Sequence, residues 1–443
     1  MKKKDVSKSA LPPDYFKGKD GTKYRFTIFK DIAVAGSVQP IPYDDIHRQE
    51  IIDLYSKRKE FAIYVHCPWC IEHCSYCHYY RGPMLKRNEL EHMLEAEKQH
   101  LEMIDREIDL RSRKVNSIYF GGGTPTVLPT DLLENAISYH VDRYGGKDCE
   151  VCLECSPITL KPQKIAVLER YINRLSVGVQ SFDDKILKLV ERKHTGALAK
   201  EVLAEVIPRF ASVNVDLIYG LYEQNLSEWL KTIETTINLK SQSVTIYRLD
   251  IREIPAIHKV FHDEPEKFPD ELMCQQMYEE ARRLLLASGY RENLIGWFLL
   301  PQVKDTVVYR ERWEKQTPCI GLGPALHNYG ADHFYETLPG HAEYIATVQA
   351  GKLPIKHVYP LTPEKKTLWY VMAQLKSSSP VYKSVIKERF GESMLNWFLD
   401  LARNYLEWQV LIEADESGDR LELSPEHHFI LEWMLVEMIA CLK

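Results

Sequence analysis

The sequence lacks three features that would place it in particular classes of protein. It has no uninterrupted run of about 18 apolar residues, so no transmembrane helix is expected. The basic stretch Met1–Asp5 is followed by no apolar segment, as a secretory signal would require. Basic residues are not in excess either, since 57 Lys and Arg stand against 63 Asp and Glu. The net charge of −6 provides no electrostatic reason to expect a nucleic-acid partner, and we expect a cytoplasmic protein.

The composition indicates a chain that folds around a sizeable core. Of its 443 residues, 45% are hydrophobic and 27% are charged, which is typical of a globular protein. In a reducing compartment its ten cysteines should be thiols or metal ligands, not disulfides. Seven of them fall into two groups, which are Cys67, Cys70, Cys74 and Cys77, and Cys149, Cys152 and Cys155.

Short apolar runs alternate with helical stretches from residue 61 onward. This alternation predicts βαβ units with a parallel sheet, and therefore an α/β fold. Six such runs suffice for a partial (β/α)6 barrel. The runs are 61–66, 115–120, 150–153, 174–179, 213–218 and 244–249.

Three regions are expected along the chain. Residues 1–60 form an N-terminal extension, and residues 61–353 form the barrel core with a substrate region. Residues 354–443 form a small helical, winged-helix-like domain that contains a hairpin over 411–423. A helix should begin after Thr362, which can cap it and which precedes a proline suited to the first turn.

Polar residues follow the ends of the predicted strands. In a β/α barrel the loops after the carboxyl ends of the strands supply the functional groups, so these residues should meet in one site. The strand ends carry the cysteine loop 70–77, the glycine run 121–125, Glu154, Gln180, Asp216 and Arg248.

The CxxxCxxC loop of Cys70, Cys74 and Cys77 suits a soft metal centre. Thiolates favour iron–sulfur clusters or zinc. Zinc normally requires two CxxC pairs about 15–20 residues apart, and Cys67 lies too close for that arrangement. Three thiolates on a four-iron cluster leave one iron open to a substrate or cofactor.

Several motifs together resemble a known family. They are Tyr64–Cys70 (YVHCPWC), Tyr119–Thr126 (YFGGGTPT), Glu154–Pro157 (ECSP), Leu175–Phe182 (LSVGVQSF) and Asp216–Leu221 (DLIYGL). The chain resembles the radical S-adenosylmethionine (SAM) superfamily, and within it the oxygen-independent coproporphyrinogen III dehydrogenase-like family. The resemblance extends over about residues 61–436 and implies a radical SAM barrel.

The resemblance assigns roles to residues of this chain. The thiolates of Cys70, Cys74 and Cys77 would bind a [4Fe–4S] cluster that cleaves SAM to a 5′-deoxyadenosyl radical. Other residues would bind SAM, and some a second SAM molecule. Gly122, Gly123 and Thr124 would bind its methionyl part, while Glu154, Gln180, Arg192 and Asp216 would hold its ribose and methionine groups. Ile218 and Arg248 would contact the second SAM, and Tyr64, near the cluster, is the candidate catalytic residue.

The second cysteine group invites an auxiliary-cluster interpretation, which the strand geometry argues against. On a strand, Cys149 and Cys155 point opposite to Cys152, so three thiolates do not converge. We expect these three thiols and Cys67 to be packed in the interior.

Departures from the family pattern bear on the reaction. The dehydrogenase has a further cysteine where this chain has Tyr79. The haem-chaperone relatives have an HNxxYW haem-binding motif, and its nearest equivalent here is Glu292–Trp297 (ENLIGW), without His or Tyr.

These departures lead us to predict a radical SAM enzyme of the two-SAM branch, which methylates or cyclopropanates an unsaturated small-molecule substrate. One alternative is coproporphyrinogen III dehydrogenase activity, which is oxidative decarboxylation, or another tetrapyrrole reaction. A second alternative is a haem-binding chaperone. We expect a flavodoxin- or ferredoxin-type electron donor as partner.

Overall fold

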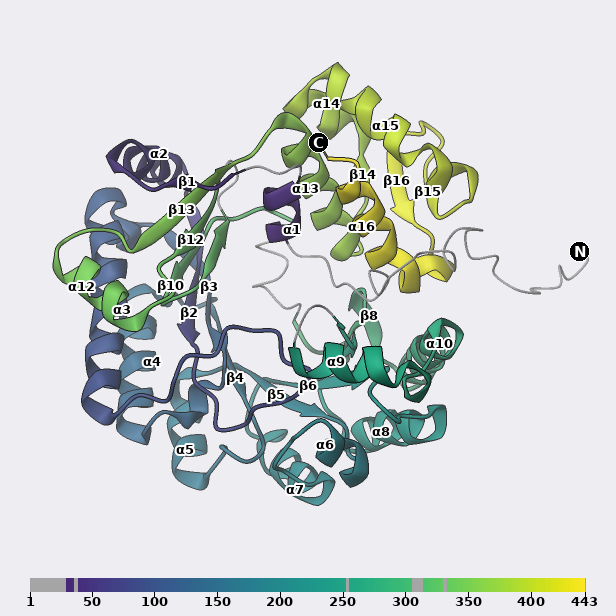
Figure 1. Ribbon diagram of the computed structural model, residues 1–443, viewed down its shortest axis with the longest axis horizontal. Coiled ribbons are helices and arrows are strands. Elements are labelled where there is room, and N and C mark those ends of the chain that lie inside the picture. The colour runs from purple at the N-terminus through teal and green to yellow at the C-terminus, as the bar shows by residue number, and fades with distance from the viewer. Residues whose placement is uncertain (1–28, 36–38, 252–254, 305–313, 330–332, 443) are drawn as a thin grey trace, which may run out of the picture.

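A nine-stranded sheet forms the centre of the molecule (Figure 1). The computed structural model describes residues 29–35, 39–251, 255–304, 314–329 and 333–442. The strand order is β10-β2-β3-β4-β5-β6-β7-β9-β8, and strands β2 to β7 are parallel. These six are β2 (Glu60–Cys67), β3 (Lys114–Gly122), β4 (Glu150–Cys155), β5 (Arg174–Gln180), β6 (Ser212–Tyr219) and β7 (Ser243–Arg248). The predicted partial barrel of six β/α strands is confirmed.

Both edges of the parallel sheet are extended by strands from the region after β7. Strand β10 (Cys319–Leu322) pairs in parallel with β2 at one edge. At the other edge, β9 (Trp297–Leu299) pairs antiparallel with β7 and then with β8 (Arg291–Leu294). The hairpin β8–β9 therefore pairs with the edge of β7 that β6 leaves open.

Helices surround the arc of strands on its outer side (Figure 1). Because both faces of the parallel strands are covered, their side chains are almost all buried, which explains the continuous apolar runs in the sequence. Local signals begin some helices, as where Asn225 and Glu228 form a capping box at α8. The helices are α3 (Arg87–Ile108), α4 (Thr130–Tyr144), α5 (Pro162–Tyr171), α6 (Asp184–Leu189), α7 (Gly196–Val206), α8 (Leu226–Asn238) and α10 (Glu271–Ala287). Helix α9 (Pro255–Asp263) instead lies near the carboxyl ends of β6 and β7, where Ile257 packs with Ile218 and Leu249.

A second hydrophobic core includes Leu368 and Phe398 of the C-terminal part, together with Ile32 and Phe334 from earlier in the chain. As predicted, Thr362 caps the first helix there and accepts a hydrogen bond from the Lys365 amide at 3.4 Å. A small sheet of order β14-β16-β15 contains the predicted hairpin. The elements are α13 (Pro363–Lys376), β14 (Val381–Tyr382), α14 (Lys383–Phe390), α15 (Glu392–Glu407), β15 (Leu411–Glu413), β16 (Arg420–Leu423) and α16 (Leu431–Ala440).

A second sheet, of order β1-β13-β12-β11, connects the N-terminal region to later parts of the chain. Helix α1 also packs on α13, where the Lys365 ammonium donates a hydrogen bond to the Ala33 carbonyl at 2.6 Å. The elements are α1 (Phe29–Val34), β1 (Ile41–Pro42), α2 (Asp45–Ser56), β11 (His327–Tyr329), β12 (His333–Thr337), α12 (His341–Gln349) and β13 (Ile355–Pro360). The division of the chain after residues 60 and 353 stays a prediction.

None of the helices within the described residues is long and apolar enough to span a membrane.

Candidate functional site

The three predicted cluster ligands lie on the loop that joins β2 to α3. Cys74 is buried, whereas Cys70 and Cys77 are half-buried, and all three are free thiols. The Cys77 amide donates a hydrogen bond to the Cys74 carbonyl at 3.1 Å, which folds the loop back on itself. Burial raises the pKa of the Cys70 thiol and that of Cys77, the latter to about 11, and the neighbouring Cys74 adds to both shifts.

This donor set fits a [4Fe–4S] cluster by its chemistry. The thiols share one short loop and lie close enough to influence one another electrostatically. In the described part of the chain, no three His, Cys, Asp or Glu side chains converge on a single metal ion. A four-iron cluster does not need such convergence, because each cysteine ligand binds a different iron atom.

The glycine run at the end of β3 is bound directly to the cysteine loop. The Gly123 amide donates to the Cys67 carbonyl at 2.9 Å, and the Thr124 amide donates to the Trp69 carbonyl at 2.9 Å. A Cβ atom at Gly123 would lie 2.6 Å from the Cys67 carbonyl oxygen, so no side chain fits there. The Thr124 hydroxyl also lies 3.4 Å from the Cys70 sulfur.

Glu154, at the end of β4, is half-buried beside this glycine run. Its two carboxylate oxygens accept hydrogen bonds from the Tyr119 hydroxyl at 2.6 Å and from the Gly122 amide at 3.0 Å. Burial raises the pKa of Glu154, and these two donors act against the increase. The ring of Tyr64 stacks on Tyr119, with centroids 5.6 Å apart. Tyr119 therefore connects Tyr64 to Glu154, because its ring stacks on Tyr64 and its hydroxyl donates to Glu154.

Asp216, on β6, is held in the barrel interior by neutral donors. Its oxygens accept hydrogen bonds from the Ser176 hydroxyl at 2.9 Å and from the Asn214 amide at 2.8 Å. Burial raises the pKa of Asp216 to about 7, although the hydrogen bond from Ser176 lowers it in part. Nearby Glu154 contributes to the increase, so the two carboxyl groups interact. Ser176, which donates to Asp216, is also the register partner of Glu154 on β5, so both carboxyl groups face the barrel interior.

Gln180 and Arg192 meet next to Gly178 of β5. A Cβ atom placed on Gly178 would lie 3.0 Å from the Gln180 side-chain nitrogen and 3.8 Å from an Arg192 guanidinium nitrogen. Arg192 is buried, and its guanidinium donates to the Cys74 sulfur at 3.4 Å and to the Gly178 carbonyl. The structure thus brings Arg192 to the cysteine loop, although it lies 118 residues away from Cys74 in sequence.

Ile218 and Arg248, the predicted contacts of a second SAM, are engaged with other parts of the protein. Ile218 packs in a hydrophobic cluster that includes Leu221 and Leu249. The Arg248 guanidinium binds both oxygens of Glu271 on α10, at 3.0 and 2.5 Å, and it lies over the Phe429 ring. These contacts direct Arg248 toward α10 and the C-terminal part.

The second cysteine group has the arrangement that strand alternation predicts. Cys152 clusters with Tyr119 in the barrel interior, whereas Cys149 and Cys155 pack in the main core. The Cys152 sulfur accepts a hydrogen bond at 3.0 Å from Arg174, a fully buried residue on β5.

The hairpin β8–β9 contains Glu292–Trp297, the nearest equivalent of the haem-binding motif in the sequence. Glu292 is buried there and accepts hydrogen bonds from the Tyr278 hydroxyl at 2.7 Å, the Arg282 guanidinium at 2.7 Å and the Gly296 amide at 3.0 Å. It also lies 3.1 Å from the ring nitrogen of His428. These contacts hold the Glu292 side chain in the interior of the protein.

Trp297, at the other end of this stretch, lies inside the barrel. Its indole N–H donates to the Ser243 hydroxyl at 3.2 Å, and the Arg174 guanidinium lies 5.2 Å from its ring centroid. Sequence analysis did not select Arg174, because a single arginine at the start of a strand has no distinguishing pattern.

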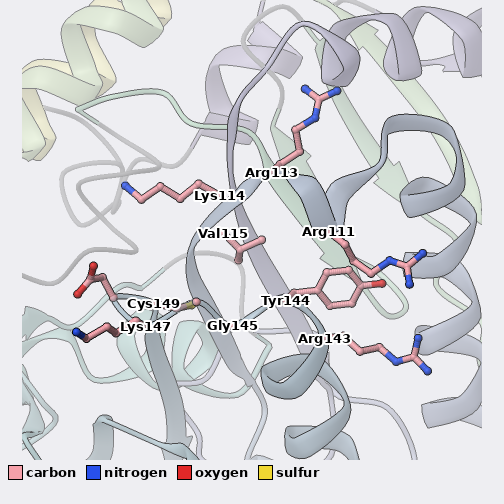
Figure 2. Close-up of a pocket in the computed structure, with 11 residues that line it drawn as sticks. Arg111, Arg113, Lys114, Val115, Arg143, Tyr144, Gly145, Lys147 and Cys149 are labelled. Carbon is pink, nitrogen blue, oxygen red and sulfur yellow. The ribbon is translucent and has the colours of Figure 1, made fainter.

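A pocket at the opposite, amino-terminal end of β3 and β4 does not belong to this site (Figure 2). It has a volume of about 310 Å³, and its basic side chains point in different directions (Figure 2). Several are already paired, for example Arg111 with Asp105 at 2.8 Å and Lys114 with Glu60 at 3.5 Å. They therefore do not converge on one anion.

Comparisons with known proteins agree with this geometry. Residues 64–236 match the family model described as the radical SAM superfamily. The heme chaperone HemW of Buchnera aphidicola subsp. Acyrthosiphon pisum is 26% identical over 370 residues, which cover 80% of this chain and 91% of the chaperone. Heme chaperone HemW of Escherichia coli K12 is 29% identical over 282 residues, covering 61% of this chain and 70% of its own.

A solved structure has the same overall fold. Coproporphyrinogen III oxidase (HemN) from Escherichia coli, described as a radical SAM enzyme, matches with a TM-score of 0.76. The alignment covers 89% of this chain and 93% of that chain at 19% identity. At that identity the match establishes the fold and leaves the reaction open.

Proposed function

Residues 64–236 are a radical SAM domain within a HemN-like fold, and from this premise we propose that the chain is a cluster- and SAM-binding protein that handles haem as a chaperone. The observation that carries the proposal is the extent of the similarity to heme chaperones, which reaches 91% of the length of one of them. This match favours the haem-chaperone alternative over the two-SAM methylation predicted from the sequence.

The proposed cluster site consists of Cys70, Cys74 and Cys77. When bound and reduced, a [4Fe–4S] cluster supplies the electron that cleaves SAM. The Gly123 and Thr124 amides hold the glycine run against the cysteine loop by hydrogen bonds. A SAM molecule bound beside the glycine run would therefore contact a rigid backbone.

The protein's own carboxylates would orient SAM. Glu154 and Asp216 are half-buried and face one space, and each oxygen that already accepts one hydrogen bond can accept a second. Charged acceptors form stronger hydrogen bonds to an amine or a ribose hydroxyl than neutral ones do. Gln180 and Arg192, beside Gly178, would complete the enclosure from the β5 side.

A second candidate is a radical SAM enzyme that turns over a small-molecule substrate, such as a tetrapyrrole or the unsaturated acceptor of a two-SAM methylation. The specific observation in its favour is that side chains of the hairpin β8–β9 are already bound to other residues of the protein. The hairpin holds the nearest equivalent of the haem motif, in which Glu292 is bound by several interior donors and the Trp297 indole N–H is bound to Ser243. A haem bound at this hairpin would have to displace these contacts. In either case the electron donor we propose is of the flavodoxin or ferredoxin type.

Two measurements on the anaerobically reconstituted protein test these alternatives. Titration with haem should give stoichiometric binding with a Soret band if the chain is a chaperone. Incubation with SAM and dithionite should release 5′-deoxyadenosine from either candidate. S-adenosylhomocysteine alongside it, without haem binding, would overturn the chaperone proposal in favour of the methylase. Decarboxylation of a porphyrinogen without S-adenosylhomocysteine would favour the dehydrogenase.

A further inference from the structure

The cysteine loop carries a buried carboxylate between two of its cysteines. Glu72 is only 5% exposed, although Ile71 next to it lies at the surface. Its first oxygen accepts a hydrogen bond from the Lys193 amide at 2.7 Å. Its second oxygen accepts one from the Ser156 hydroxyl at 2.9 Å and lies 3.1 Å from the Arg192 guanidinium. Both oxygens of this side chain are therefore satisfied.

These partners come from elements far from the loop in sequence. Ser156 follows β4, while Arg192 and Lys193 follow α6. The Lys193 ammonium adds a second link, since it donates to the Ile71 carbonyl at 3.0 Å. A buried carboxylate costs several kcal/mol unless it is paired and fully hydrogen-bonded, so this side chain is stable here only while the loop is docked.

The same guanidinium connects Glu72 to a proposed cluster ligand. Arg192 is 7% exposed, and the nitrogen that faces Glu72 also donates to the Cys74 sulfur at 3.4 Å. Its other terminal nitrogen is bound to Ser156 at 3.3 Å and to the Gly178 carbonyl. Glu72 therefore orients the Arg192 guanidinium toward the Cys74 sulfur. Its negative charge also balances the positive charge of Arg192.

We propose that Glu72 is a positioning residue for the iron–sulfur cluster. It holds the cysteine loop against the ends of β4 and β5, and it sets the charge that the Cys74 sulfur experiences through Arg192. The inference rests on the proposed function, because it requires Cys74 to be a cluster ligand. Hydrogen bonds to the ligand sulfurs and the net charge nearby both set the reduction potential of such clusters.

Two variants separate the two parts of this role. Glu72→Gln keeps the size of the side chain and an acceptor oxygen but removes the negative charge, so the Arg192 charge is no longer balanced. Its reconstituted cluster should have a more positive midpoint potential than that of the wild type, measured by EPR-monitored redox titration. Glu72→Ala removes the link altogether, and the variant should lose iron to a chelator faster than the wild type does. Removing an outer-shell partner of a metal ligand usually lowers metal affinity about 10–100-fold.

Glu388→Gln, an exposed residue on α14, is the matched control and should leave the potential and the rate of iron loss unchanged. Circular dichroism of each variant checks that the fold is intact. The inference is overturned if Glu72→Gln has an unchanged or lower potential, or if Glu72→Ala loses iron at the wild-type rate. A wild-type protein that binds no [4Fe–4S] cluster would instead refute the proposed function.

Discussion

At the scale of single residues, we expect Asp216 to make SAM binding dependent on pH. Burial raises its pKa to about 7, so the side chain is ionised above that pH and protonated below it. If it accepts hydrogen bonds from SAM, affinity should fall as the pH drops from 8 to 6. Replacing a charged acceptor by a neutral one should make the binding free energy of SAM less favourable by about 1 kcal/mol, which is roughly fivefold in Kd. Equilibrium dialysis with labelled SAM on the reconstituted protein measures this change.

Two variants give this prediction its controls. Asp216→Asn should bind SAM more weakly than the wild type at pH 8 and should show little further change at pH 6. Asp400→Asn, which alters an exposed residue on α15, should retain the pH dependence of the wild type. An Asp216→Asn protein with the wild-type pH profile would show that another group titrates.

The cysteines allow a second test at the same scale. Cys74→Ala should abolish the [4Fe–4S] cluster and the release of 5′-deoxyadenosine, because the thiolate at the centre of the loop is lost. Iron and sulfide analysis together with mass spectrometry of the products measure both effects. Cys441→Ala, at an exposed thiol beyond α16, should retain cluster and products. Full iron content in Cys74→Ala would exclude Cys74 as a ligand.

At the scale of elements, the contact between the end of β3 and the cysteine loop tolerates no side chain at Gly123. A Cβ atom there would lie 2.6 Å from the Cys67 carbonyl and 2.7 Å from the Trp69 carbonyl. Gly123→Ala should push the loop away, break the two amide hydrogen bonds that join the elements and lower the iron content severalfold. Gly146→Ala is the matched control, since a Cβ atom at Gly146 meets nothing within 4 Å. Equal iron content in the two variants would contradict this account.

The elements also show what could be predicted from sequence. The six parallel strands were predictable because burial on both faces makes each of them a continuous apolar run. Glu154 and Asp216 were predicted to lie together because both were placed at strand ends, but Asp216 lies within β6 (Ser212–Tyr219) and not at its end. Glu72 could not be found in this way, because its partners are up to 121 residues away and depend on how the loop docks. Arg192 stands in a charged run that usually indicates a solvated surface, and only the resemblance to a family selected it.

At the scale of the whole molecule, Glu292 joins the barrel to the C-terminal part. It sits on the hairpin β8–β9 and binds Tyr278 and Arg282 of α10, and it reaches His428, which precedes α16. Burial opposes ionisation of this carboxyl, but His428 and Arg282 outweigh burial and lower its pKa to about 2. A carboxylate with a lowered pKa stabilises the folded protein at pH values above its unfolded pKa of about 4.3.

The substitution Glu292→Gln tests this connection. It should lower the free energy of unfolding at pH 7 by about 1.5–3 kcal/mol, the usual value of hydrogen bonds to a charged group. The difference from the wild type should shrink as the pH falls from about 4 toward 2, because the wild-type carboxylate is then protonated as well. Urea unfolding of the cluster-free protein, followed by circular dichroism, measures both effects. Glu388→Gln should change the stability by no more than about 0.5 kcal/mol at either pH. If Glu292→Gln were equally stable at pH 7, Glu292 would not be the residue that couples the barrel to the C-terminal part.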